Sequence, residues 1–436
     1  MGVFNVEGQI NFKNLTDMKT IVKQIMGFTI MLIIMTLSSQ AWSQSDNGFY
    51  TVRGVVKDKS NQKRLEYAVV SIHGSNIGTI ANSNGEFSVK IKDELNAKNL
   101  EISHLGYGTV LVPVTGKETN DITVYMQQKP SLLDEITIVA VDPAVIVEKA
   151  VSRIADNYSK ESNMLTAFYR ETVKKRRSYI NVSEAIVDLY KTPYREGVDR
   201  DQVQIYKGRK LVSPKAEDTL MVKLLGGPNL SIYIDIVKNP DLILNPETLN
   251  YYKYTFEEGV MIGDRAHYVI SFKPQVIMPY ALYNGKLFID KESLSFTRAE
   301  FNLSMSDRNK ATQAILKKKP YGMHFKPELI SFLVNYRQRD GLTHLNYIRS
   351  EVQFKCDWKK RLFSTNYTIV SETVITGTSD AKAKRIPYRL AFNDNQALSD
   401  KVINFYDNNF WEDYNIIEPE ESLESAVNRL RKEEKR

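Results

Sequence analysis

Short runs of alternating apolar and polar residues recur about every ten residues between positions 49 and 128, with Gly and Asn between them. Alternation with a period of two is typical of half-buried strands, and regularly spaced short strands indicate a small β-sandwich. Asn84-Gly85 predicts a tight turn inside this unit because both residues tolerate positive φ. The first part of the chain is therefore expected to be a compact sandwich.

The pattern changes to helical spacing after Asp142-Pro143, a good N-cap followed by a residue suited to a first turn. Apolar residues then recur with a period near 3.6 as far as Tyr158, which predicts a helix. Strands dominate again from about residue 165. They are predicted over residues 178–190, 202–206, 251–257, 267–272, 285–290, 296–303, 328–337, 344–354 and 364–374.

Asp340-Gly341 is the signal of a hairpin turn between two of these strands. One helix is predicted among the strands, over residues 214–225, with Ser213 as its N-cap. Long antiparallel strands in sequence favour a curved, partly open barrel. The expected fold class is mainly β, with a sandwich followed by a larger antiparallel β domain and a few helices.

The end of the chain combines an aromatic segment, residues 405–419, with a charged helix predicted over residues 420–433. Phe405, Phe410, Trp411 and Tyr414 crowd this short segment. An exposed cluster this apolar would promote aggregation. We therefore expect Trp411 and its neighbours to dock onto the larger β domain.

The N-terminal region has the three parts of an export signal. Lys19 and Lys23 precede an uncharged apolar stretch, residues 25–37, which is shorter than the about 20 residues of a membrane span. Ala41-Trp42-Ser43 then provides a small-x-small cleavage site. Residues 1–43 are predicted to be a signal peptide, and an uncleaved N-terminal anchor is the alternative.

Cleavage is expected between Ser43 and Gln44, and Met18, directly before Lys19, is the expected start of translation. No cysteine directly follows the apolar stretch, which argues against a lipoprotein acylated on cysteine. The chain is therefore expected in the periplasm or at the periplasmic face of the outer membrane.

Four sequence pieces in the first unit carry a family resemblance. They are Val52-x-Gly54-x-Val56-x-Asp58, Leu65-x-x-Ala68-x-Val70-x-Ile72, Gly78-Thr79-x-x-Asn82-x-Asn84-Gly85-x-Phe87 and Ile102-Ser103-x-Leu105-Gly106-Tyr107. In order and spacing they resemble the carboxypeptidase regulatory-like domain, a transthyretin-like seven-stranded sandwich. The resemblance implies a fold and no activity, since such domains occur beside peptidases and at the periplasmic end of TonB-dependent transporters.

Asn82 and Asn84 stand where members of this family usually carry a turn aspartate, which argues against bound calcium. The strand predicted over residues 133–139 is similar to the one that follows the domain in the transporters. Only about 300 residues remain after it, too few for a transporter barrel. Residues 268–301 resemble the half-barrel of periplasmic lipoprotein carriers, and residues 168–171 with the aromatic tail resemble uncharacterised envelope proteins.

The residues that could carry chemistry are few. None of the five histidines, His73, His104, His267, His324 and His344, has an acidic residue three positions later or a histidine four positions later. The single cysteine, Cys356, lies in strand-like sequence and is expected to be a half-buried structural thiol. No catalytic, cofactor-binding or metal-ligating residue is predicted, and no cofactor is expected.

The predicted domains are a signal peptide (1–43), the sandwich (47–129), a linker strand and helix (130–160), the antiparallel β domain (161–400) and the C-terminal segment and helix (401–436). The net charge of +7 is mild, and no nucleic-acid-binding signature is present. The sequence predicts a non-enzymatic envelope protein, with the sandwich as a docking module and the larger domain binding a partner protein, lipid or glycan. The alternative is a hydrolase with a site assembled from scattered residues of the larger domain.

Overall fold

The computed structural model describes residues 48–130, 141–220, 222–224, 226–358, 364–378, 383–393, 396–404 and 410–434. Residues from Tyr50 onward form one compact unit. The predicted signal peptide, its cleavage site and the strand at 133–139 lie outside the described residues. Among the described residues, no helix is long and apolar enough to cross a membrane.

Residues 48–130 form the predicted sandwich from two sheets. One sheet has the order β4-β1-β7, with β1 (Phe49–Asp58) parallel to β7 (Thr119–Met126) and β4 (Glu86–Lys92) on its other side. The other has the order β3-β2-β5-β6 and is antiparallel, with β2 (Val69–Ile72), β3 (Gly78–Ile80), β5 (Asn99–Ser103) and β6 (Val110–Pro113). Inward residues of both sheets, Phe87 and Ile102 among them, make one core. The predicted seven-stranded sandwich is confirmed.

The sequence motifs of the sandwich meet at Asp58. Tyr107 donates a hydrogen bond to Asp58 Oδ2 at 2.7 Å, and Gln128 donates to the same atom at 3.0 Å. Hydrogen bonds from Ser60 and Tyr107 hold the pKa of Asp58 below its usual range. The ionised carboxylate thus ties β1 to the loop after β5, so the first and the fourth of the four motif pieces meet through this hydrogen bond.

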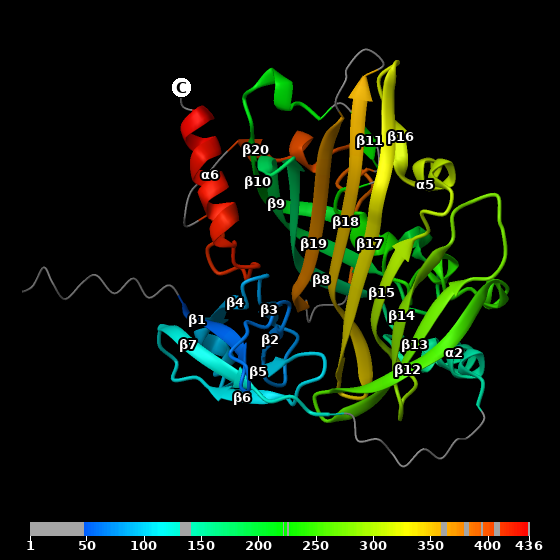
Figure 1. Cartoon of the computed structure of the whole chain (residues 1–436). Helices are drawn as coiled ribbons and strands as arrows, with labels where there is room; N and C mark the ends of the chain where they lie inside the picture. The colour runs from blue at the N-terminus through cyan, green and yellow to red at the C-terminus, as the bar shows by residue number, and fades with distance from the viewer. Residues whose placement is uncertain are drawn as a thin grey trace, which may run out of the picture. The chain divides into compact units, whose positions relative to one another are not determined.

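Most strands in the rest of the described chain form one open, eleven-stranded sheet (Figure 1). Its order is β12-β13-β14-β15-β17-β18-β19-β8-β9-β10-β20, and neighbours are antiparallel except β10 and β20. The bounds are β8 (Asn163–Lys175), β9 (Ser178–Lys191), β10 (Gln202–Val212), β12 (Tyr252–Ile262), β13 (Arg265–Pro274), β14 (Tyr283–Asp290), β15 (Phe296–Leu303), β17 (Met323–Arg339), β18 (Leu342–Trp358), β19 (Thr365–Thr378) and β20 (Ile403–Asn404). The predicted antiparallel β domain is therefore an open sheet.

The hairpin turn between β17 and β18 is the predicted one. Asp340 and Gly341 have φ of 51° and 77°, the left-handed conformation that both positions of this turn require. The two 17-residue strands that it joins run through the middle of the sheet.

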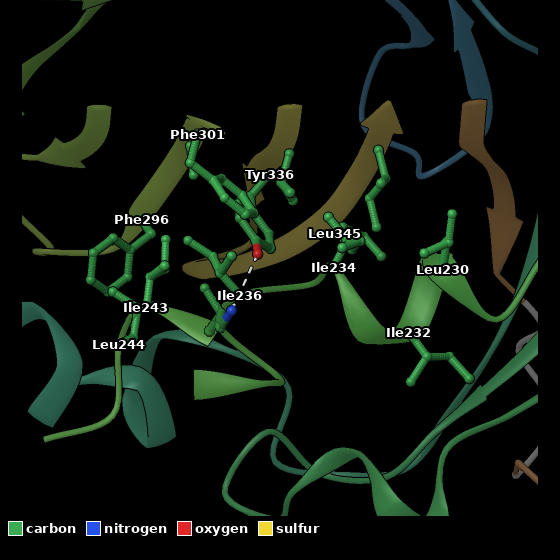
Figure 2. Close-up of a cluster of buried hydrophobic side chains, with 14 of the residues drawn as sticks. Leu230, Ile232, Ile234, Ile236, Ile243, Leu244, Phe296, Phe301, Tyr336 and Leu345 are labelled. Carbon is green, nitrogen blue, oxygen red and sulfur yellow. Dashed lines mark hydrogen bonds between the residues drawn. The ribbon is translucent and has the colours of Figure 1, made fainter. Parts of the chain in front are cut away.

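One face of the sheet, here the first face, is covered by helices and by an irregular segment. The helices are α2 (Pro143–Ser152) and α3 (Ile154–Asn157), and the side chain of Asp142 accepts the predicted N-cap bond from Ala144 N. The irregular segment, residues 228–251, is named the plug segment and contains α4 (Leu230–Tyr233), η4 (Pro240–Leu242) and η5 (Leu249–Tyr251). Figure 2 shows its Ile and Leu side chains packed beside Phe296, Phe301 and Tyr336.

The opposite, second face carries Phe168, Ile186, Tyr347 and Val374, which pack with Trp411. Ile80 of the sandwich belongs to the same cluster. Helix α6 (Glu421–Glu434) covers β9 and β10 further along, through its Leu and Val residues (Figure 1). The predicted docking of Trp411 on the larger β domain is confirmed, and so is the predicted C-terminal helix. Phe405 lies outside the described residues.

The prediction of a helix over residues 214–225 is wrong. The described part of this stretch holds η3 (Ala216–Asp218) and β11 (Lys223–Leu224), which pairs with β16 (Leu316–Lys318). The apolar residues Leu220, Val222 and Leu224 stand at every second position and pack into one apolar cluster. This period of two is that of a strand, and β11 is extended rather than helical. Helix α5 (Arg308–Ile315) was not predicted, nor were η1 (Asp93–Leu95), η2 (Val198–Arg200) and η6 (Leu398–Asp400).

Candidate functional site

A cavity of about 310 Å³ lies between the sandwich and the second face of the large sheet. Its walls come from β5 and the following loop on one side, and from β13, β15 and β17 on the other. Its charged and imidazole-bearing lining residues are Glu101, His104, Asp264, Arg265, His267, Arg298 and Arg337. We call this cavity the junction pocket.

The Leu105-Gly106-Tyr107 motif fixes one wall of the junction pocket. Gly106 N donates to Met261 O at 2.8 Å, and Gly263 N donates to Tyr107 O at 3.1 Å. The motif loop thereby pairs with the hairpin that joins β12 and β13. Gly263 has φ of +60°, a conformation that favours glycine, and a Cβ there would lie 2.6 Å from Thr109 Oγ1, so a larger residue would strain the backbone and displace this side chain.

His267 places a buried nitrogen beside the pocket. Its side chain is 2% exposed, and its Nδ1 lies 2.9 Å from the backbone oxygen of Arg265. A carbonyl only accepts hydrogen bonds, so Nδ1 carries the proton and Nε2 is an acceptor. Nε2 has no hydrogen-bond partner. Burial lowers the pKa of His267, which keeps the ring neutral and leaves Nε2 as an unpaired acceptor.

Asp290 is the carboxylate nearest to this imidazole, with Oδ2 3.9 Å from His267 Nε2. Arg265 binds it through two hydrogen bonds of 2.6 and 2.7 Å, and Ser293 donates further bonds. Burial raises the pKa of Asp290, but the bonds from Arg265 and Ser293 outweigh burial and hold the pKa at about 2. Asp290 is therefore ionised and already neutralised by Arg265.

Two further guanidinium groups line the pocket in fixed positions. Arg298 donates to Glu300 at 2.6 Å and to Asn335 Oδ1 at 3.0 Å. Arg337 lies 3.4 Å from Glu101 and donates to the backbone oxygen of Ser75 at 3.1 Å. Each cation is oriented by a carboxylate and by a neutral acceptor, so the pocket presents pre-positioned donors with little net charge.

His104 lies at the sandwich side of the pocket between two backbone carbonyls. Nδ1 is 2.9 Å from Leu105 O, and Nε2 is 3.1 Å from Glu66 O. Two carbonyls favour a doubly protonated ring, but burial and the nearby Arg298 outweigh them and lower the pKa of His104. The ring therefore holds the loop rather than facing a ligand with a charge.

None of the residues that line the junction pocket was predicted from the sequence to be a site residue. The sequence analysis considered all five histidines, and the structure brings two of them, His104 and His267, to this pocket. His73 lies 2.7 Å from Glu101, and His324 lies 2.9 Å from Asp357. The one signal in the sequence that relates to the pocket is the position of His104 directly before the Leu105-Gly106-Tyr107 motif, because this motif forms one wall of the pocket.

The described residues contain no group of three or more His, Cys, Asp or Glu side chains placed to hold a metal ion. Cys356 is 7% exposed in β18, and burial raises its pKa to about 11, which keeps the thiol protonated. The apolar first face of the sheet is not an open groove, because the plug segment and α2 fill it.

Comparison with known proteins gives one family match. No curated protein matches the chain. A DUF1329 family protein from Desulfovibrio piger is similar in structure with 12% identity and a TM-score of 0.23, over 56% of this chain and 96% of that one. A protein from Bacteroides fragilis, described as membrane-associated and of unknown function, has 11% identity and a TM-score of 0.14, over 76% and 98%.

Similarities at this level define neither the fold nor the function of the chain. The sequence match is more specific and falls on the part of the chain that carries the four motif pieces. Residues 52–138 match the family model of the CarboxypepD_reg-like domain, so the N-terminal sandwich is a domain of this family.

Proposed function

We propose that this is an exported, non-enzymatic cell-envelope protein that binds a glycan in the junction pocket. The observation that carries the proposal is the buried, unpartnered Nε2 of His267, which offers a hydrogen-bond acceptor beside two oriented guanidinium groups. An unpaired buried acceptor costs free energy unless a ligand or water satisfies it. A hydroxyl group of a sugar donates such a bond and accepts bonds from Arg298 or Arg337.

The composition of the pocket favours a hydroxyl-rich ligand over a lipid or a strongly charged one. Glu101 and Asp264 accompany the cations, and Asn335 and Gln338 add amide groups. Tyr67 adds an aromatic ring to the wall. Acyl chains would require an apolar groove, and the apolar first face is occupied by the chain itself.

The surroundings of His267 argue for binding rather than for acid–base catalysis. A histidine that acts as a base gains from a carboxylate on its other nitrogen, because the carboxylate stabilises the imidazolium. The Nδ1 of His267 lies against a carbonyl instead, and burial disfavours the charged ring. Asp290 is held by Arg265 and is poorly placed to serve this role.

Export is proposed from the N-terminal pattern of residues 19–43, with the periplasm or the periplasmic face of the outer membrane as the location. Fractionation of the source cells and N-terminal sequencing of the envelope form test it. We expect the envelope form to begin at or near Gln44. A form that retains Met1 or Met18 would contradict the predicted cleavage.

Binding is tested by calorimetric titration of the protein with oligosaccharides released from the envelope of the source cells. The variant His267→Phe removes the acceptor and retains a ring of similar size, and we expect at least about tenfold weaker binding, the equivalent of one lost hydrogen bond. His324→Phe, at an exposed position on β17, is the matched control. Equal binding by His267→Phe and wild type, or no binding to any oligosaccharide, would refute the glycan site.

A further inference from the structure

The loop between β13 and β14 exposes an unusually apolar surface. Ile277 is 93% exposed, Tyr280 is 50% exposed and Val276 is 38% exposed. Single exposed apolar residues are ordinary, but three within five positions of one loop indicate a contact surface.

The loop is held in this conformation by its surroundings. Lys310 Nζ donates to Met278 O at 2.7 Å, and Gln275 N donates to Tyr251 O at 2.9 Å. At the other end, Ser304 N donates to Leu282 O at 2.8 Å. The anchored backbone leaves Ile277 at the tip with its side chain directed away from the protein core.

Positive charge surrounds this loop. Residues 308–322, which form α5, β16 and the following turn, contain five basic residues and no acidic one. They are Arg308, Lys310, Lys317, Lys318 and Lys319. Lys273, at the end of β13 directly before the loop, adds a sixth basic residue. Asp307, the acid directly before this stretch, caps α5, where its side chain accepts from Asn309 N, and its Oδ2 lies 3.9 Å from Lys310 Nζ.

The apolar loop and the basic stretch belong to one surface. Ala281 of the loop packs in the same cluster as Ala311 and Ile315 of α5. The turn after β16 exposes Tyr321 almost completely, at 95%. We call residues 273–282 together with 308–321 the loop–α5 surface; α5 and β16 can be followed in Figure 1.

We propose that the loop–α5 surface docks onto an anionic lipid bilayer, with Ile277 and Tyr280 entering the interfacial layer. Apolar and aromatic tips flanked by lysines match the two parts of a bilayer surface, since the tips enter the headgroup region and the cations face anionic lipids. A symmetric contact with a second copy is disfavoured because it would place the six cations against their own copies. This inference does not depend on the proposed glycan site.

A local fluorescence experiment tests insertion. Ile277→Cys in the full chain can be labelled with an environment-sensitive fluorophore, because the native Cys356 is buried. Vesicles of phosphatidylcholine with 30–40% phosphatidylglycerol, on the order of a bacterial anionic fraction, should raise emission several-fold. Tyr388→Cys, on another exposed site (83%), is the matched control and should not respond. Equal responses at both sites, or none at Ile277, would overturn the proposal.

A second experiment uses co-sedimentation with the same vesicles to test the electrostatic attraction between the lysines and the anionic lipids. Ile277→Ser and the triple variant Lys317→Glu, Lys318→Glu, Lys319→Glu should each bind at least about fivefold more weakly, and 0.5 M salt should weaken wild-type binding. The predicted signal segment is common to all variants, so differences report the loop–α5 surface alone. Unchanged binding of both variants, or an Ile277 signal that rises with protein concentration without vesicles, would refute membrane docking.

Discussion

Lys191 Nζ lies 2.9 Å from Asp235 Oδ2, and both side chains are at most 1% exposed. The pair joins the end of β9 to the plug segment. Tyr336 and Tyr194 also donate to Asp235, at 2.7 and 3.1 Å. Burial would lower the pKa of Lys191, but Asp235 and Asp201 outweigh burial and raise it. The plug segment is therefore held on the sheet by an electrostatic contact as well as by apolar packing.

Asp235→Asn should strongly destabilise the protein. The substitution leaves Lys191 buried without its closest counter-charge, and removing one partner of a buried pair typically costs about 3–5 kcal/mol. Urea unfolding measures the loss. Asp241→Asn, exposed in the same segment, should change stability by less than about 0.5 kcal/mol. Equal stabilities of the two variants would show that the pair does not hold the plug segment.

Trp411 anchors the C-terminal segment on the second face. Its ring meets Phe168 edge-on at 5.5 Å, and the Arg209 guanidinium lies 4.8 Å from it. Trp411→Ala should cost about 3–5 kcal/mol, the usual loss for a buried tryptophan. Trp411→Phe should cost less because Trp411 Nε1 is buried without a hydrogen-bond partner. Thermal melts compare both with Tyr388→Ala, and a stable Trp411→Ala variant would mean that the segment is not anchored through this ring.

The strands were predictable because their signal is local. The period-two alternation of residues 296–303 coincides with β15, and Asp340-Gly341 marked the central hairpin. The plug segment was not predictable, because its structure depends on distant partners. Asp235 and Lys238 look like surface residues in sequence, and only their contacts with β9 and the following loop explain their burial.

The junction pocket was beyond sequence analysis for the same reason. His104 and His267 are far apart in the chain, and no spacing rule connects them. The pocket depends on pairing between the loop at Leu105 and the hairpin at Ile262, which is a tertiary contact. What the sequence did show was the motif that makes this pairing possible, Leu105-Gly106-Tyr107.

The sandwich, residues 47–129, is expected to fold as an isolated fragment. Its core is continuous and separate from that of the large sheet. Ile80 and Asn82 contact the C-terminal segment in the whole chain, so the fragment should be less stable than the full protein. About 80 residues support a marginal core. Circular dichroism on heating should show a cooperative transition, and a featureless melt would contradict an independent domain.

No carboxypeptidase activity is expected despite the family of the sandwich. The reaction needs a metal that activates water and a carboxylate that takes its proton. The buried motif acid Asp58 is engaged by Tyr107 and Gln128 as a structural group. Purified protein with added zinc should release C-terminal residues from a peptide panel at background rate. Chelator-sensitive turnover that disappears on replacing one histidine would overturn the expectation.

Stability should fall as the pH drops below about 6.5, the ordinary pKa of histidine. Burial lowers the pKa of His104, His267 and His344 in the folded protein. The unfolded chain therefore binds protons more tightly at these positions. The contribution of the three histidines to the free energy of unfolding is complete above pH 6.5 and is lost as the pH falls below it. Each group contributes up to about 1.4 kcal/mol per pH unit.

The contribution of His267 can be separated from the rest by comparing urea unfolding at pH 7.5 and pH 5.5. Burial favours the neutral forms of Glu171 and Glu418 and raises their pKa values. The folded protein therefore binds protons more tightly at these two carboxyl groups than the unfolded chain does, which offsets part of the destabilisation caused by the histidines at low pH. His267→Gln leaves those carboxyl groups in place and should reduce the pH difference in stability. Ser271→Ala, on the same strand without an ionisable group, should keep the wild-type difference. A His267→Gln variant as pH-sensitive as wild type would show that the ring takes up a proton as readily in the folded protein as in the unfolded chain, which would contradict the buried, neutral ring on which the proposed acceptor depends.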